Sequence, residues 1–139
     1  MAATFGVRLL TPEETVREAE IVSLQAPGSE GFLGVWAHHA PLITALRPGP
    51  LTLCDAGGRE EVFAVSGGFL EISENLATIL ADAVEGSEEI DLQRAREAQE
   101  RARRRLAARS PGLDVDRARA ALLRAINRIR VAGRYGQGG

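Results

Sequence analysis

One seven-residue phrase occurs twice in the second half of the sequence, and it constrains the fold more than any other feature. Residues 90–96 read Ile-Asp-Leu-Gln-Arg-Ala-Arg, and residues 113–119 read Leu-Asp-Val-Asp-Arg-Ala-Arg. In each copy an aspartate, Asp91 or Asp114, precedes a long Ala/Leu/Arg segment, where its carboxylate can accept a hydrogen bond from a free N–H at a helix start. Between the copies, the Ser-Pro-Gly at 110–112 breaks the helix, since Pro cannot continue it and Gly adopts the left-handed conformation that closes it. The sequence therefore predicts an antiparallel helix hairpin.

The spacing of apolar residues predicts how the two helices pack together. In the second helix they recur at steps of three and four, at Val115, Ala118, Leu122, Ala125 and Ile129. The matching stripe of the first helix is Leu92, Ala95, Ala102 and Leu106. Ala is the strongest helix former, but burial of its methyl group contributes only on the order of 1 kcal/mol. The hairpin is thus expected to be held together weakly.

Arginines follow a second register along both helices. Arg94, Arg101 and Arg105 are spaced by seven and four residues, and Arg117, Arg124 and Arg128 repeat this spacing. In an antiparallel hairpin the two trios could converge on phosphates or carboxylates, which the planar guanidinium group recognises well. The alternative is a solvated charged face, interspersed with Glu97 and Glu100. Both interpretations stay open at this point.

Charge divides the chain into two modules. The sequence has no lysine, and its net charge of −2 hides an uneven distribution. Residues 1–86 carry 4 arginines against 12 acidic residues, a net charge of −8, whereas residues 87–139 carry 13 against 7, a net charge of +6. We therefore expect a first domain over 1–86 and a second over 87–139 that ends in a flexible glycine-rich tail.

Short apolar segments separated by turns fill the first module. Candidate strands lie at 5–9, 18–24, 34–36, 42–45, 51–54, 61–65, 68–72 and 76–81, with a hairpin turn at Asp55-Ala56-Gly57-Gly58. Such short strands without intervening helices predict an antiparallel β-sandwich whose interior is filled by the alternating Val, Ile, Leu and Phe. The predicted fold class is α+β, an N-terminal antiparallel β-sandwich followed by a C-terminal two-helix antiparallel hairpin.

The composition offers little for catalysis. His38 and His39 are the only histidines, and because they are adjacent they would point to opposite faces of a strand and could not share a metal ion. The scarcity of His, Cys and pocket carboxylates argues against an enzyme. Phe32 and Trp36 flank the histidines and fit either core anchors or an exposed docking patch. No apolar run is long enough to span a membrane, and no signal-peptide pattern is present, so we expect a soluble intracellular protein.

Several motifs together resemble the epsilon subunit family of the bacterial F-type rotary ATP synthase. They are Gly34-Val35-Trp36-Ala37-His38-His39-Ala40-Pro41-Leu42, Leu46-Arg47-Pro48-Gly49, Val65-Ser66-Gly67-Gly68-Phe69-Leu70-Glu71 and Ile90-Asp91-Leu92-Gln93-Arg94-Ala95. Together, in this order and before a helix hairpin, these motifs are specific evidence for the family, whereas each motif alone is weak evidence. The family usually has Pro-Gly where this chain has Ala37-His38, while His39 matches the family histidine.

The resemblance implies a non-catalytic subunit of the central rotor stalk of a proton-translocating ATP synthase, with no required cofactor. Its sandwich would contact the gamma subunit and the membrane c-ring, with Trp36, His38 and His39 as contact residues. The complex would place it peripherally on the cytoplasmic face of the bacterial plasma membrane. Its helices would reach the catalytic beta and alpha subunits and inhibit ATP hydrolysis. The residues expected to make this inhibitory contact are Arg101, Arg103, Arg104, Arg105, Arg124, Arg128 and Arg130.

The resemblance also implies a regulatory ligand, because some bacterial members bind ATP while the helices are folded back. Carried over by position, the nucleotide site comprises Glu85, Ile90, Asp91, Arg94, Ala95, Arg101, Arg124 and Arg128. The arginines would bind phosphates, and Glu85 or Asp91 would accept from adenine or ribose. In the alternative interpretation these residues have only a structural role, in which Asp91 caps the helix and Arg94 pairs with a neighbouring carboxylate.

A nucleic-acid-binding module is the alternative function, since arginine-rich helices suit phosphate backbones. The acidic residues within the helices, the acidic first module and the absence of aromatic residues between Phe69 and Tyr135 argue against it. We therefore expect protein partners and no nucleic acid.

Overall fold

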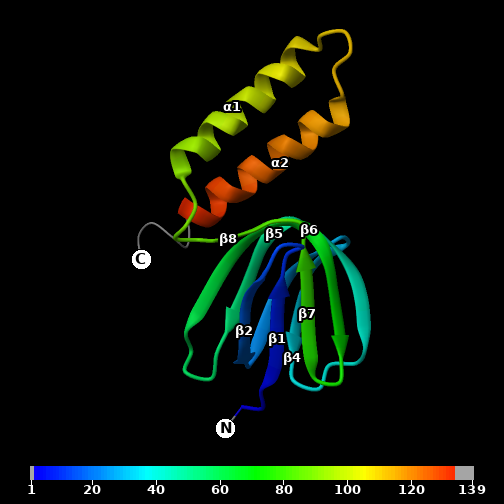
Figure 1. Cartoon of the computed structure of the whole chain (residues 1–139), viewed down its shortest axis with the longest axis vertical. Helices are drawn as coiled ribbons and strands as arrows, with labels where there is room; N and C mark the ends of the chain where they lie inside the picture. Colours follow the sequence, from blue (N-terminus) through cyan, green and yellow to red (C-terminus); the bar gives the residue numbers. More distant parts are fainter. Residues whose placement is uncertain (1, 134–139) are drawn as a thin grey trace. The chain divides into compact units, whose positions relative to one another are not determined.

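The computed structural model describes residues 2–133, which form two compact units, one ending at Gly86 and the other beginning at Ser87. Within this range the first unit contains the strands and the second contains the helices (Figure 1). The elements are β1 (Phe5–Leu10), β2 (Thr15–Ile21), β3 (Ser23–Gly28), β4 (Gly31–Trp36), β5 (Leu42–Cys54), β6 (Glu60–Ser73), β7 (Leu76–Ala81), β8 (Val84–Gly86), α1 (Leu92–Ala108) and α2 (Val115–Val131). The predicted sandwich and helix hairpin are confirmed. The predicted flexible tail at 134–139 lies outside the described residues.

A single hydrogen-bonded sheet folds over to make both layers of the sandwich. Its strand order is β2-β1-β7-β6-β5-β3-β4, with β8 also paired to β6. The C-terminal half of β6 pairs with β7 and with the start of β5, whereas its N-terminal half pairs with β8 and with the end of β5. The long β5–β6 hairpin therefore belongs to both layers. Strands β1, β2 and β7 complete one layer, and β3, β4 and β8 complete the other.

The two long strands are a correction to the predicted shorter ones. We expected breaks at Pro48-Gly49-Pro50 and at Val65-Ser66-Gly67-Gly68, but β5 and β6 continue through both. Pro48 and Pro50 fall between Leu46 and Thr52, where β3 has no register partner on β5, so their missing N–H groups are tolerated. Gly67 and Gly68 have φ angles of 113° and 134°, and a Cβ at Gly68 would clash with the Leu80 carbonyl oxygen. These glycines let β6 bend where a bulkier residue could not.

Apolar side chains from both layers form the interior of the first unit. The largest fully buried residues include Leu9, Leu24, Leu51, Leu70 and Ile79. They belong to one cluster whose buried members lie between Phe5 and Ala81. The first unit thus contains a complete hydrophobic core of its own.

The sequence pattern predicted that the apolar strand residues fill the interior, but some of them are exposed. Ile43, Phe69 and Leu80 are 71%, 58% and 48% exposed. Each of them follows or precedes another apolar residue on the same strand, and adjacent strand residues must face opposite sides. Phe69 and Leu80 are register partners, so they lie side by side on the outer surface.

Arg17 and Glu61 connect the two layers at the surface. Arg17 on β2 donates from Nη2 and Nε to the Glu61 carboxylate on β6, at 2.8 Å for the shortest pair. The hydrogen bond and the adjacent negative charge of Glu61 raise the pKa of Arg17 above its ordinary value. A bidentate ion pair therefore joins an edge strand to the opposite layer.

The second unit is an antiparallel hairpin of two 17-residue helices. The predicted break at 110–112 is confirmed, since α1 ends at Ala108 and α2 begins at Val115. The residue that closes α1 differs from the expectation. Arg109, with φ of 46°, takes the left-handed conformation and donates its N–H to the Arg105 carbonyl, while Gly112 lies later in the turn.

Candidate functional site

Both copies of the repeated phrase fold into the same helix start. Asp91 and Asp114 have nearly identical backbone angles, with φ of −80° and −81° and ψ of 99° and 98°. The Oδ1 atom of Asp91 accepts from the N–H of Arg94 at 3.1 Å, and that of Asp114 accepts from the N–H of Arg117 at 3.0 Å. The predicted N-caps are confirmed. Asp91 is exposed, so its cap role leaves the carboxylate in contact with solvent.

Small residues line the seam where α1 packs on α2. Ala95 and Ala102 of α1 and Ala118 and Ala125 of α2 are buried. The larger residues of the predicted stripes, Leu92, Leu106, Leu122 and Ile129, are only partly buried. The seam therefore buries little apolar area for two helices of this length, as the sequence predicted.

The six arginines of the repeated register lie on one broad side of the hairpin. At about 100° of rotation per residue, each trio lies about a quarter turn from the seam alanines of its helix, in the same rotational sense. Because α2 runs back along α1 (Figure 1), equal offsets bring both trios to the same side. We call this surface the arginine face, and it consists of Arg94, Arg101, Arg105, Arg117, Arg124 and Arg128.

The lengths of the helices also set the neighbours across the arginine face. Since the start of α1 lies level with the end of α2, Arg94 falls near Arg128, Arg101 near Arg124 and Arg105 near Arg117. Arg94, Arg101, Arg105 and Arg124 are exposed and have no ion pair with any residue in the range 2–133. The alternative interpretation, in which Arg94 pairs with a neighbouring carboxylate, is therefore not observed among these residues. A side with this many cations attracts an anion.

The remaining arginines of the predicted inhibitory contact are placed differently. By the same rotation, Arg103 and Arg130 lie toward the opposite side of the hairpin. Arg104 donates from Nε to Glu100 one turn earlier, at 3.2 Å. The predicted group of seven is thus not one surface, and four of its members, Arg101, Arg105, Arg124 and Arg128, belong to the arginine face.

The predicted nucleotide-site residues are divided between the two units. Glu85 lies on β8 of the first unit, where it is the register partner of Ala64. The other seven lie on the second unit, where Ile90 and Ala95 are buried and Asp91 caps α1. Asp91, Arg94, Arg101, Arg124 and Arg128 share the hairpin, and these five carry the charges a nucleotide would meet.

The predicted contact residues of the sandwich lie at the end of β4 and in the following loop. Trp36 is 62% exposed and Phe32 is 61% exposed, which settles their open assignment in favour of the surface. His38 is exposed with φ of 63°, and His39 Nδ1 lies 2.7 Å from the Ala40 carbonyl oxygen. Among residues 2–133 no three His, Cys, Asp or Glu side chains are grouped as metal ligands would be.

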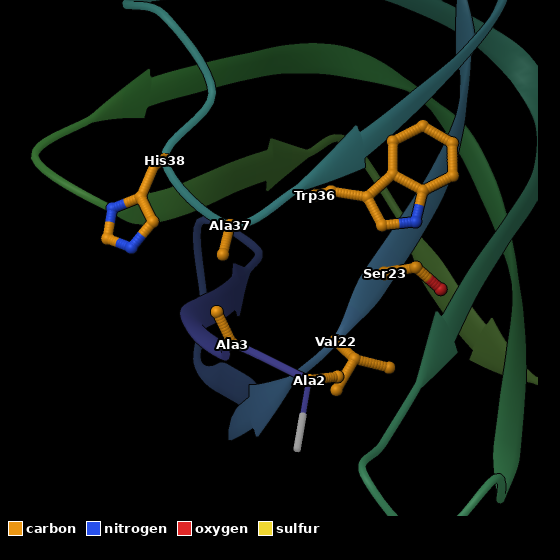
Figure 2. Close-up of a pocket in the computed structure, with 7 residues that line it drawn as sticks. All are labelled: Ala2, Ala3, Val22, Ser23, Trp36, Ala37 and His38. Carbon is orange, nitrogen blue, oxygen red and sulfur yellow. The ribbon is translucent and has the colours of Figure 1, made fainter.

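A shallow cavity of about 360 Å³ adjoins this loop. It is lined by Ala2, Ala3, Val22, Ser23, Trp36, Ala37 and His38 (Figure 2). The lining is mostly small or apolar, and Trp36 and His38 stand at two sides of it in Figure 2. Sequence reasoning missed the part played here by Asn75, whose side chain bonds to both the loop and the N-terminal segment. Its only signal was its position in a predicted turn after Ser73 and Glu74.

The chain matches two family descriptions in succession. Residues 4–87 match "ATP synthase, Delta/Epsilon chain, beta-sandwich domain", and residues 88–133 match "ATP synthase, Delta/Epsilon chain, long alpha-helix domain". Curated relatives agree over nearly their whole length. The ATP synthase epsilon chain of Moorella thermoacetica is 53% identical over 94% of this chain and 98% of its own. That of Desulforamulus reducens is 44% identical over 95% of this chain and 99% of its own.

Solved structures share the fold at low sequence identity. A chain of the Euglena gracilis mitochondrial ATP synthase (OSCP/F1/c-ring) superposes with a TM-score of 0.82 and 23% identity, covering 91% of this chain and 80% of that one. A chain of the Tetrahymena thermophila mitochondrial ATP synthase central stalk and c-ring gives a TM-score of 0.57 and 18% identity, covering 95% and 96%. Among residues 2–133, neither helix is long and apolar enough to cross a bilayer.

Proposed function

The chain belongs to the delta/epsilon chain family of ATP synthase, and we propose that it is a non-catalytic subunit of the central rotor stalk that restrains ATP hydrolysis through its helix hairpin. The observation that carries this proposal is the order of the two matched domains, sandwich then hairpin, over residues 4–133. The proposed complex translocates protons, and the chain sits peripherally on the cytoplasmic face of the bacterial plasma membrane.

The sandwich is the proposed anchor, docking on the gamma subunit and the c-ring. Its support is the set of large apolar groups exposed on its surface, which includes Trp36 and Phe32 on β4 and Phe69 on β6. Exposed aromatic residues are enriched where one protein packs on another, because they bury much area with few rotatable bonds. Trp36, His38 and His39 are the proposed contact residues of this anchor.

The hairpin is the proposed brake. Its seam consists largely of alanine, so undocking one helix from the other forfeits little buried area. Its exposed arginines, among them Arg101 and Arg124, suit an acidic surface on the catalytic beta subunit, which they would approach together with alpha. We place the inhibitory contact on the arginine face, with Arg101 and Arg124 at its centre.

ATP is the proposed regulatory ligand of the hairpin, and no cofactor is required. Guanidinium groups from both helices on one side match a row of phosphates. A ligand held by both helices would favour their packed arrangement over an open one by the ratio of its affinities for the two. Each tenfold ratio corresponds to about 1.4 kcal/mol.

Hydrolysis by the cognate catalytic head with gamma tests the brake. We would compare the full chain with a fragment of residues 1–87, which retains the complete core of the sandwich. If both bind and only the full chain suppresses hydrolysis, the hairpin inhibits. Equal hydrolysis with both bound would exclude the hairpin as the inhibitor, and absence of binding by either would overturn the proposed anchor.

A matched pair of variants assigns the inhibition to one side of the hairpin. Arg101→Gln/Arg124→Gln removes two charges from the arginine face, and Arg96→Gln/Arg119→Gln removes two from the opposite side. All four residues are exposed, and the net charge changes equally. We expect the first pair to relieve inhibition and the second to retain it. Equal relief would point to net charge alone.

ATP binding is tested by isothermal titration of the full chain. Asp91→Asn keeps an oxygen that can cap α1 and removes the charge, so loss of binding would not reflect a lost helix start. We expect Arg101→Gln/Arg124→Gln to weaken ATP binding and Arg96→Gln/Arg119→Gln to leave it unchanged. If the wild-type chain shows no heat of binding at millimolar ATP, the ligand proposal is refuted. The inhibitory role of the hairpin is then tested by the hydrolysis experiment alone.

A further inference from the structure

Asn75 occupies the turn between β6 and β7, where three backbone segments of the sandwich meet. Its own N–H and carbonyl groups lie in a tight turn in which both Glu74 and Asn75 are left-handed, with φ of 50° and 61°. Asn adopts this conformation more readily than most residues. The Asn75 carbonyl oxygen accepts from the N–H of Gly6 at 3.1 Å, which joins the turn to the start of β1.

The side chain of Asn75 makes two further bonds in different directions. Its Oδ1 atom accepts from the backbone N–H of His38 at 2.7 Å, and its Nδ2 atom donates to the Thr4 carbonyl oxygen at 3.0 Å. An N–H requires an acceptor and a carbonyl requires a donor, so these two partners fix the orientation of the amide group. One side chain thus links the β4–β5 loop to the N-terminal segment.

These bonds end at or beside residues that line the cavity in Figure 2. His38 is one of the lining residues, and Thr4 directly follows two others, Ala2 and Ala3. His38 is itself left-handed, a conformation that is unfavourable for most side chains and persists only where its surroundings hold it. The backbone N–H of His38 is held by the Oδ1 atom of Asn75.

We propose that Asn75 is a positioning residue for subunit docking, holding the His38 loop and the N-terminal segment in the arrangement that the stalk partner recognises. This inference rests on the proposed anchoring function of the sandwich. In this role Asn75 does not contact the partner directly. Instead it raises the fraction of molecules whose loop is already in the binding arrangement, and apparent affinity scales with that fraction.

Three variants of the full chain separate this role from general stability. Asn75→Gly keeps the left-handed turn and removes both side-chain bonds. Asn75→Asp keeps an acceptor for His38 N–H and removes the donor to Thr4. Glu74→Gly is the matched control, because it relaxes the neighbouring left-handed position, and the Glu74 side chain has no bond or ion pair with a residue in the range 2–133.

Backbone amide exchange and affinity for purified gamma subunit are the two measurements. In Asn75→Gly we expect exchange at His38 to accelerate by roughly threefold to tenfold, the equivalent of one ordinary hydrogen bond. Exchange at the core residues Leu70 and Ile79 should stay as in wild type. Affinity for gamma should fall measurably, and by at most this factor, because affinity follows the fraction of molecules whose loop is already positioned. Asn75→Asp should restore only part of the protection at His38, because its second carboxylate oxygen would face the Thr4 carbonyl oxygen. Glu74→Gly should match wild type in both measurements.

The outcomes distinguish this inference from the function on which it rests. Faster exchange at His38 with unchanged affinity would overturn the positioning role alone. Unchanged exchange at His38 in Asn75→Gly would also overturn it. Absence of gamma binding by the wild-type chain would instead overturn the proposed anchor.

Discussion

At the scale of single residues, Asp91 and Asp114 cap their helices through the same type of hydrogen bond, and the contribution of this bond to stability can be measured. Asp114→Ala removes the acceptor for Arg117 N–H, so we expect the hairpin to lose about 1 kcal/mol of stability. Asp116→Ala is the control, since Asp116 also lies in the first turn of α2 but is not the cap, and its loss should amount to a few tenths of a kcal/mol. Helical circular dichroism during thermal unfolding of the full chain measures both. Equal losses would mean that charge and not the cap bond matters.

The sequence predicted well those structural roles that depend on hydrogen bonds between residues close in the chain. The caps at Asp91 and Asp114 and the Asp55 turn, where Oδ1 accepts from Gly57 and Arg59, follow from neighbours within a few positions. Asn75 could not be recognised in this way, because its partners are 37 and 71 residues away. Its role exists only once the sandwich has brought the ends of β1, β4 and β6 together.

At the scale of elements, Gly68 is the glycine of the β6 bend whose Cβ position comes closest to neighbouring backbone. Gly68→Ala would place a methyl group against the backbone of Leu80 and Ala81 at a φ of 134°. We expect a loss of more than about 2 kcal/mol in unfolding free energy, measured by urea titration with far-ultraviolet circular dichroism. Gly58→Ala is the control, because Gly58 also has a positive φ but has open space around its Cβ position, so its loss should be about 1 kcal/mol. Similar losses would show that backbone strain, and not the clash with the backbone of Leu80 and Ala81, causes most of the destabilisation.

The same elements show where strand prediction fails. Proline and paired glycines ordinarily end strands, so β5 and β6 were each expected in two pieces. They continue because β3 leaves residues 47–51 of β5 without a partner on one side, and because β6 must bend to enter the second layer. The helices, in contrast, follow from the aspartate caps, the break at 110–112 and the apolar periodicity, and the predicted alanines of the seam are buried. The arginine face also followed from spacing, although Arg103, Arg104 and Arg130 do not belong to it.

At the scale of the whole molecule, the two units differ in how far each can stand alone. The first has a buried cluster from Phe5 to Ala81, whereas the seam between α1 and α2 is largely alanine. A fragment of residues 1–87 should therefore unfold cooperatively, while a peptide of residues 88–139 should be weakly helical, since isolated helices of this length are marginal in water. Circular dichroism of the two fragments tests this.

This contrast bears directly on regulation. If the hairpin is marginal by itself, small differences in binding energy are enough to decide its state, and a ligand shared by both helices becomes an effective switch. In the full chain, we then expect millimolar ATP to slow amide exchange at the seam alanines Ala102 and Ala118 without changing exchange at Leu70 of the sandwich. A strongly helical, cooperatively melting 88–139 peptide would contradict this, because a hairpin that is stable alone would need no ligand to hold it closed.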